Sequence, residues 1–279
     1  MTKLKYTLKN DVLFKMMFVE YPELLKNLVA QILSIQPESI GQFVITNSEI
    51  PPDAISEKFC RLDINMTVDG QRVDLEIQVD DRGDYTERAL YYWAREYSSG
   101  LAEGEKYRDL PRAIIISIIA FEKFDCAEYR SEFQTLEVRR HTPLNDKMCL
   151  LFFELPKLPT VTGADDKLES WLTLFSAETE EEIATIKSWG DPIMEQAIDA
   201  YRHVVATDKF KELERLRSLA RHNEASALDH ARREAEKAER EKWQSVVAKK
   251  DMALADKDAA LAELRLQLAA LKTKAVDKA

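Results

Sequence analysis

One short stretch, Phe59 to Val79 (FCRLDINMTVDGQRVDLEIQV), constrains the fold of this chain more than any other. Apolar and polar residues alternate along it on both sides of Asp69-Gly70, and an Asp-Gly pair between alternating runs is typical of a two-residue β-hairpin turn. Because side chains alternate between the two faces of a strand, each strand has one apolar face and one polar face. We therefore predict an antiparallel hairpin that buries its apolar face.

The turn also sets the register of the predicted hairpin. With the Asp-Gly pair as the loop, Asp63 lies opposite Glu76 and Asn65 lies opposite Asp74. Like charges that face each other directly destabilise a sheet, so two facing carboxylates indicate a cation between them, and oxygen ligands suit Mg²⁺ or Mn²⁺. The residues alone leave open a second interpretation, in which this face is polar because water covers it.

Composition and termini narrow the classes of function. The net charge is −10, so binding to nucleic acid requires a local basic surface or a metal that reverses the local sign. The chain holds 7 glycines and no Walker-type or dinucleotide-binding fingerprint, which disfavours a phosphate-binding loop. The N-terminal MTKLKYTLKN lacks the apolar region of a signal peptide, and the apolar run in the middle of the chain is too short to span a bilayer. The three cysteines are widely spaced and form no zinc-type pairs. This pattern fits a reducing compartment, so we expect a cytoplasmic protein.

Patterns on either side of the hairpin predict further elements. Asn10 or Asp11 is typical of a helix start, and Pro22 opens a second helix. Two apolar runs indicate strands that are buried on both faces. In chain order, the other predicted elements are a strand at Phe43 to Thr46, a helix at Arg82 to Glu103, a buried strand at Arg112 to Phe121, a partly alternating segment at Glu128 to Val138, a buried strand at Met148 to Leu155, and an acidic helical region over 165–210.

The last part of the chain has a different pattern. From about Lys209 onward, Gly and Pro disappear and Ala, Glu, Lys, Arg and Leu dominate. The apolar seam of a heptad repeat comprises Val247, Leu254, Leu261, Leu264, Leu268 and Leu271. Lys250 and Lys257 interrupt it at the earlier d positions. A coiled coil that forms a homodimer is the first interpretation, and a solitary exposed helix is the alternative.

The order of these motifs resembles the core of the PD-(D/E)XK nucleases. More narrowly, it is similar to the recombination-promoting nuclease and transposase family of bacteria. The resemblance covers roughly residues 8–155. The residues that carry it are Asn10-Asp11-Val12-Leu13-Phe14-Lys15, Arg61-Leu62-Asp63, Leu75-Glu76-Ile77-Gln78, Arg88-Ala89-Leu90-Tyr91-Tyr92, Gly104-Glu105-Lys106-Tyr107 and the apolar strand from Ala113.

The resemblance implies an α/β fold with a restriction-endonuclease-like core, in which helices flank a mixed central sheet. We expect this nuclease domain over residues 1–158. A small helical region follows at 159–208, and a charged helix or coiled-coil tail follows at 209–279.

The resemblance also implies a set of site residues. Asp63 and Glu76 correspond to the metal ligands, with the backbone carbonyl of Ile77 as a third ligand. Gln78 occupies the position of the usual catalytic lysine, and Leu62 replaces the proline that normally precedes the aspartate. A glutamine orients water or phosphate by hydrogen bonding but supplies no positive charge.

Other residues are candidates for auxiliary roles, and each has a structural alternative. Asp11 is either an active-site acid or a helix cap, and Lys15 is either a phosphate contact or a surface residue. Asp74 shares the polar face and is either a second-metal ligand or structural. Arg88, Tyr91 and Arg95 are candidate DNA contacts, although aromatic residues at this helical spacing are more typical of a core.

These expectations lead to one function and its rivals. The chain is predicted to be a Mg²⁺-dependent endonuclease, with Mn²⁺ as an alternative metal, that hydrolyses phosphodiester bonds in DNA and is linked to recombination or mobile elements. One alternative is a non-catalytic interaction protein with a degenerate nuclease core and a dimerising coiled coil. Another is an RNA-directed nuclease with the same chemistry. No membrane partner is expected.

Overall fold

The computed structural model of the chain describes residues 2–47, 63–81, 83–101 and 104–276, with side chains described as far as residue 266. The N-terminal end of the predicted hairpin, including Arg61 and Leu62, lies outside the described residues. The chain divides into two compact units, Met1–Ala220 and Arg221–Ala279. The sheet and all helices before the last one belong to the first unit.

The first unit is built on a mixed sheet, as predicted from the sequence. Within the described residues, the strand order is β1-β2-β3-β4-β6-β5. Strand β4 pairs in parallel with β3 and with β6, and the remaining pairs are antiparallel. The strands are β1 (Phe43–Ile45), β2 (Ile64–Val68), β3 (Gln71–Gln78), β4 (Ala113–Ile119), β5 (Arg130–Phe133) and β6 (Met148–Glu154).

Helices flank this sheet, and polar residues begin most of them. The α-helices are α1 (Asp11–Glu20), α2 (Pro22–Ile32), α4 (Tyr85–Ser98), α5 (Lys167–Ser176), α6 (Glu180–Ser188), α7 (Pro192–Ala206) and α8 (Asp208–Val276), and the short 3₁₀ helices are η1 (Pro37–Ser39), η2 (Tyr107–Asp109) and η3 (Leu155–Lys157). Asn10 caps α1 by accepting a hydrogen bond from the Leu13 amide, and Thr179 and Glu182 form a capping box at α6. The choice between Asn10 and Asp11 as the cap is therefore resolved in favour of Asn10.

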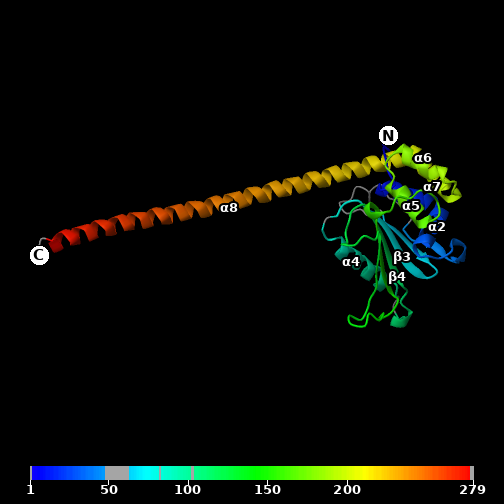
Figure 1. Cartoon of the computed structure of the whole chain (residues 1–279), viewed down its shortest axis with the longest axis horizontal. Helices are drawn as coiled ribbons and strands as arrows, with labels where there is room; N and C mark the ends of the chain where they lie inside the picture. Colours follow the sequence, from blue (N-terminus) through cyan, green and yellow to red (C-terminus); the bar gives the residue numbers. More distant parts are fainter. Residues whose placement is uncertain (1, 48–62, 82, 102–103, 277–279) are drawn as a thin grey trace. The chain divides into compact units, whose positions relative to one another are not determined.

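The two faces of the sheet are covered by different helices. On one face, Val73 and Leu75 of β3 join a large apolar core that includes residues of α1, α2, α5, α6 and α7. On the other face, α4 covers the sheet, and a smaller cluster joins its Tyr85, Ala89 and Tyr92 to residues of β4 and β6. Figure 1 shows α4 on one side of strands β3 and β4, with α2 and α5 on the opposite side. The helical region after residue 158 therefore shares its core with the sheet.

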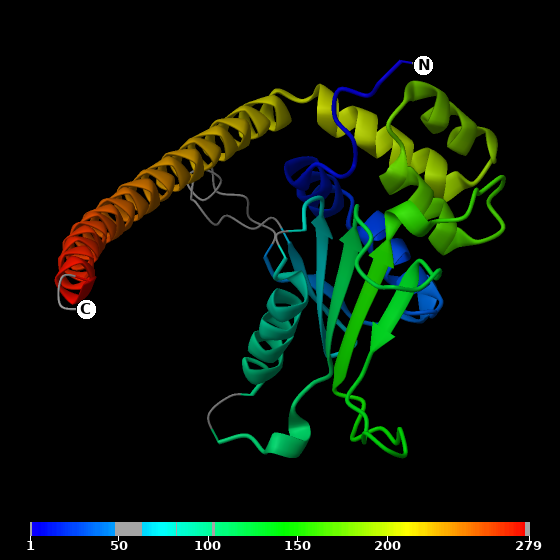
Figure 2. The same ribbon diagram turned by 60° about the vertical axis from the view of Figure 1, so that its left-hand side comes forward.

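Helix α4 lies in the connection between two parallel strands, β3 and β4. It runs from Tyr85 to Ser98 and is therefore shorter at both ends than the helix predicted at Arg82 to Glu103. Just after it, a Cβ atom at Gly100 would lie 2.6 Å from the Pro111 ring, so this position has no room for a side chain. Figure 2 shows β3, β4 and β6 side by side, with the segment between β5 and β6 extending beyond the sheet.

The second unit consists of the greater part of α8. Leu254, Leu261 and Leu264 of the predicted heptad seam are exposed by 59%, 51% and 60%, and the side chains of Leu268 and Leu271 lie outside the described residues. Ion pairs one turn apart, such as Arg232 to Glu236, line the helix. In the described part of the chain, no helix is both long and apolar enough to cross a membrane.

Candidate active site

The hairpin has the predicted register over the pairs from Ile64–Leu75 to Val68–Gln71. Asp69 and Gly70 have φ values of 46° and 77°, which a two-residue type I′ turn requires. Asn65 pairs with Asp74, and the ladder ends at the next described pair toward Asp63. Asp63 directly precedes β2, so continuing the register brings it beside Glu76.

Three acidic residues gather on the polar face of this hairpin, beneath α4. Asp74 is 3% exposed and Glu76 is 8% exposed, whereas Asp63 is half-buried. Burial, reinforced by the negative charges of Asp63, Glu76 and Glu96, raises the pKa of Asp74 well above its usual range. The Oδ1 atom of Asp74 is buried and has no hydrogen-bond donor within the described residues. This burial does not fit the interpretation in which water covers the face, and buried acids with a raised pKa make it a candidate for a functional site.

Tyr85, the first residue of α4, holds one of these acids. Its hydroxyl donates a hydrogen bond of 2.6 Å to Oε1 of Glu76. The ring is 1% exposed, and burial, together with the Glu76 charge, raises the pKa of the Tyr85 hydroxyl well above its usual range. The helical spacing correctly indicates Tyr85 as a core residue but does not reveal this bond. The only sequence signal was a tyrosine at the start of the helix that follows the Glu-X-Gln strand.

Gln78, which the resemblance places at the position of the catalytic lysine, is held on both sides of its amide. Its Nε2 donates to the backbone carbonyl of Asp80 at 3.2 Å, and its Oε1 accepts from Nη2 of Arg88 at 3.1 Å. The Arg88 guanidinium also lies 5.0 Å from the centroid of the Tyr85 ring, within the range of a cation–π contact. Arg88 thus contacts two residues of the candidate site from α4.

Lys15 and Asn47 fix the backbone at Asp63. Lys15 is 3% exposed, and its Nζ donates to the carbonyl oxygen of Asp63 at 3.1 Å. Asn47 Nδ2 donates to the same oxygen at 3.0 Å. Lys15 is therefore a buried residue and not a surface residue. Its ammonium group holds the backbone at Asp63, which is a candidate metal ligand. Sequence reasoning missed Asn47, because no spacing rule links it to a residue sixteen positions later.

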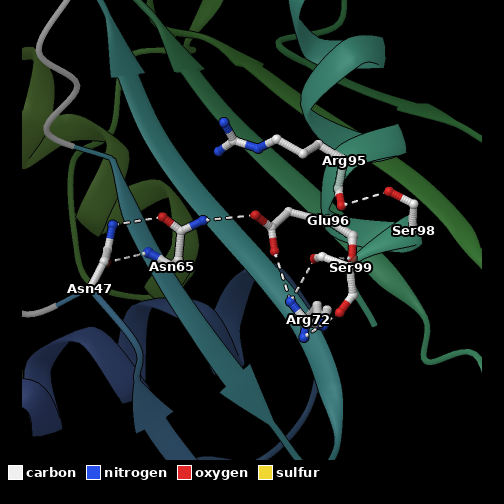
Figure 3. Close-up of polar contacts among 7 residues, drawn as sticks. All are labelled: Asn47, Asn65, Arg72, Arg95, Glu96, Ser98 and Ser99. Atoms are coloured by element: carbon white, nitrogen blue, oxygen red, sulfur yellow. Dashed lines mark hydrogen bonds and ion pairs between the residues drawn. The ribbon is translucent and has the colours of Figure 1, made fainter. Parts of the chain in front are cut away.

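A network of polar side chains connects the hairpin to α4 on the same face (Figure 3). Asn65 exchanges hydrogen bonds with Asn47, and its Nδ2 reaches Glu96 Oε1 of α4 at 3.3 Å. Arg72 of β3 pairs with Glu96 at 3.3 Å and donates to the hydroxyl of Ser99 at 3.0 Å. These contacts fix the distance between the hairpin and the helix that covers the acids.

The remaining candidates from the sequence lie apart from this network of bonds. The Asp11 carboxylate forms an ion pair with Arg217 of α8 at 2.9 Å. Tyr91 is 64% exposed, and Arg95 is also exposed. In Figure 3 the Arg95 side chain extends from α4 over the strands, on the side where Asn65 and Glu96 lie. The structure thus joins Arg88 to Gln78 and leaves Tyr91 and Arg95 facing solvent.

The chemistry of the acidic cluster fits a hard divalent cation. Carboxylates and a backbone carbonyl are the ligand types that Mg²⁺ and Mn²⁺ accept, and Oδ1 of Asp74 is a buried oxygen with no hydrogen-bond partner within the described residues. Within the described residues, no three or more His, Cys, Asp and Glu side chains form a metal-binding group. The ligand set expected from the sequence has two carboxylates and the Ile77 carbonyl, which is fewer side chains than such a group requires, and it stays a prediction.

The chain matches the model of a protein family over residues 8–231, and that family is described as PD-(D/E)XK nuclease family transposase. The match covers most of the chain and extends past the motifs of the hairpin to helices α5, α6 and α7 and the beginning of α8. No curated protein and no solved structure matches the chain.

Proposed function

The chain belongs to the PD-(D/E)XK nuclease family of transposases, and we propose that it is a divalent-metal-dependent endonuclease that hydrolyses DNA. The observation that carries this proposal is the buried acidic cluster under α4, in which Oδ1 of Asp74 has no hydrogen-bond partner within the described residues. A buried carboxylate oxygen without a hydrogen-bond donor lowers stability, and Oδ1 of Asp74 is such an atom within the described residues. A bound cation removes that penalty.

In this proposal the metal ligands are Asp63, Glu76 and the carbonyl of Ile77. When bound, Mg²⁺ or Mn²⁺ provides an activated water and offsets the charge of the phosphate. The Tyr85 hydroxyl orients Glu76 by its 2.6 Å hydrogen bond. Lys15 and Asn47 hold the Asp63 backbone in place, so the ligands are ordered before any metal binds, which lowers the cost of binding.

The exposed side of α4 is the proposed surface for DNA. Tyr91 and Arg95 are exposed on this helix, and an arginine there contacts phosphate while a tyrosine packs on sugar or base. Because the net charge of the chain is −10, contacts of this kind depend on a local positive surface and on the bound metal.

A plasmid-nicking assay with Mg²⁺ or Mn²⁺ tests the proposed activity. We expect nicking by the intact chain, loss of activity with EDTA, and a reduction of more than about 100-fold in Asp63→Asn and Glu76→Gln, because loss of a direct ligand exceeds the usual effect of a supporting residue. Glu38→Gln serves as the matched control, since Glu38 is exposed in η1. Wild-type rates in both ligand variants would contradict the assigned site.

We also propose that the chain forms a homodimer through α8. The exposed leucines at 254, 261 and 264 form the described part of an a/d seam, and a dimer would place one active site on each DNA strand. In sedimentation experiments, we expect the double variant Leu261→Asp/Leu264→Asp to be monomeric. Met252→Asp, which alters an exposed residue outside the seam, should leave the oligomeric state unchanged. Dimers in both variants would exclude this seam.

A non-catalytic scaffold is the second candidate, and Gln78 favours it, because the usual lysine is missing from the motif. Calorimetric titration separates the two functions. Binding of Mg²⁺ or Mn²⁺ that Glu76→Gln abolishes supports the nuclease, whereas no binding by the intact chain supports the scaffold. If cleavage is found, a panel of ribose and deoxyribose substrates distinguishes a DNA nuclease from an RNA nuclease.

A further inference from the structure

The contacts of Gln78 limit what its side chain is able to do. The Nε2 atom faces the carbonyl of Asp80, and the Oε1 atom faces the Arg88 guanidinium. Rotating the amide by half a turn would bring oxygen against oxygen and nitrogen against nitrogen, so the orientation is defined by its partners. One of the two N–H donors of the amide is engaged at Asp80, and Gln78 presents no positive charge toward a phosphate.

Arg88 supplies a positive charge at the same place. Its Nη2 lies 3.1 Å from the Gln78 amide oxygen, and its guanidinium lies over the ring of Tyr85, whose hydroxyl holds Glu76. The side chain is half-buried, and its buried Nε has no hydrogen-bond acceptor within the described residues. A guanidinium carries five N–H donors, so the bond to Gln78 leaves donors for another ligand.

We propose that Arg88 is a catalytic residue that donates hydrogen bonds to the scissile phosphate and replaces the lysine missing from position 78. This inference rests on the proposed nuclease function. Gln78 then orients Arg88 and does not itself contact the reacting group. The positive charge that a lysine at position 78 of β3 would supply is supplied instead from the first turn of α4. The Tyr85 ring and the Gln78 amide hold the Arg88 guanidinium in place.

The role is electrostatic. During hydrolysis, a bond forms between the water oxygen and phosphorus as the bond from phosphorus to the leaving oxygen breaks, and a proton released by the water ends on the leaving oxygen. Arg88 keeps all its protons, because a guanidinium is not deprotonated in proteins. It stabilises the negative charge that develops on the phosphate oxygens, as preorganised donors do in other hydrolytic sites.

Rescue by a displaced charge is the test. Single-turnover cleavage of a DNA duplex in Mg²⁺ is measured for the full chain and for Arg88→Ala, Arg88→Lys, Gln78→Lys and the double variant Gln78→Lys/Arg88→Ala. Arg88→Ala should reduce the rate about 100- to 1,000-fold, the usual effect of removing one such donor. The double variant should recover to within about tenfold of wild type. Arg108→Ala, in which an exposed arginine of η2 is removed, should match wild type.

Two further measurements separate this role from a structural one. Calorimetry should give the same Mg²⁺ affinity for Arg88→Ala as for wild type, because Arg88 is not a ligand. If Arg88→Ala fails to fold, as judged by circular dichroism, Arg88→Lys carries the test and should cut about tenfold more slowly than wild type while binding Mg²⁺ normally.

The outcomes are distinct. A wild-type rate in folded Arg88→Ala, or in Arg88→Lys where only that variant folds, would overturn this inference and leave the nuclease function intact. A slow Arg88→Ala that also loses Mg²⁺ affinity and is not rescued by Gln78→Lys would overturn it in favour of a structural role. A full chain that never cleaves DNA would overturn the proposed function, and this inference with it.

Discussion

On one face of the sheet, β3 directs Val73 and Leu75 into a core of aromatic and aliphatic side chains supplied by five helices. On the other face, the same strand directs Asp74 and Glu76 toward a single helix, α4. The side chains on the first face contact many other apolar side chains. Their packing stabilises the fold, and another apolar residue of similar volume would serve at most of these positions. The second face buries two acids, and Oδ1 of Asp74 has no hydrogen-bond partner within the described residues, so this face lowers stability at the place where we propose a site. The difference shows that a single strand of eight residues serves both purposes through its alternation alone.

The largest expected effect concerns the apolar face. Phe14 of α1 is fully buried and contacts Phe18 and Phe175 with ring centroids 5.1 Å and 5.8 Å away. We expect Phe14→Ala to lower the free energy of unfolding by about 3–5 kcal/mol, since it removes apolar area and leaves a cavity. Tryptophan fluorescence during urea unfolding measures this loss, because Trp171 lies in the same core.

The exposed Leu90 of α4 provides the control for that measurement. Leu90→Ala should change the free energy of unfolding by no more than about 0.5 kcal/mol. Equal losses in the two variants would contradict the assignment of Phe14 to a tightly packed core.

A smaller effect of opposite sign is expected on the polar face. In metal-free protein near neutral pH, Asp74→Asn should raise the free energy of unfolding by about 1–3 kcal/mol, the usual cost of an unsatisfied buried polar group. The pKa of Asp74 is raised in the folded state, so between the unfolded value of about 3.9 and that raised value the folded chain binds more protons than the unfolded chain. Stability of the wild type therefore falls as pH rises through this window.

Urea titrations in EDTA at several pH values measure the difference between the two proteins. The advantage of Asp74→Asn should be smallest near pH 4 and should grow toward neutral pH. It should shrink again when Mg²⁺ is added, because the cation stabilises the wild-type carboxylate. A difference that does not vary with pH would show that Asp74 carries no excess proton in the folded protein.

The smallest effect is expected in the network between the hairpin and α4. Asn65→Ala removes hydrogen bonds to Asn47 and Glu96 and should lower the free energy of unfolding by about 1 kcal/mol. Thr67→Ala, on the same face of β2, is the matched control. If the two variants unfold alike, the network in Figure 3 adds nothing to the position of α4.

Local patterns predicted much of this architecture. The Asp-Gly turn and the alternation around it gave the register that pairs Asn65 with Asp74, and the β-branched run from Ala113 gave a strand buried on both faces. Both follow from interactions between residues close in sequence. The same logic placed the acids on a common face of the hairpin.

The supporting residues of the site were beyond such patterns. The bond from Lys15 to the Asp63 carbonyl and the ion pair of Asp11 with Arg217 join residues far apart in the chain, and no periodicity describes them. The contact between Arg88 and Gln78 depends on how α4 docks on the sheet. The sequence therefore indicated which strands carry the acids. It did not indicate that Tyr85 bonds to Glu76, that Lys15 bonds to the Asp63 backbone or that Arg88 bonds to Gln78.

The turn at Asp69-Gly70 has a consequence for the order of folding. A two-residue hairpin closes in about 1–10 μs, whereas the parallel pairing of β3 with β4 must wait until the long connection that contains α4 has closed. We therefore expect the acids of the hairpin to meet first in water, where their repulsion is weak. They lose that water only when α4 docks. The docking of α4 is then the step of folding at which repulsion between the carboxylates becomes strong.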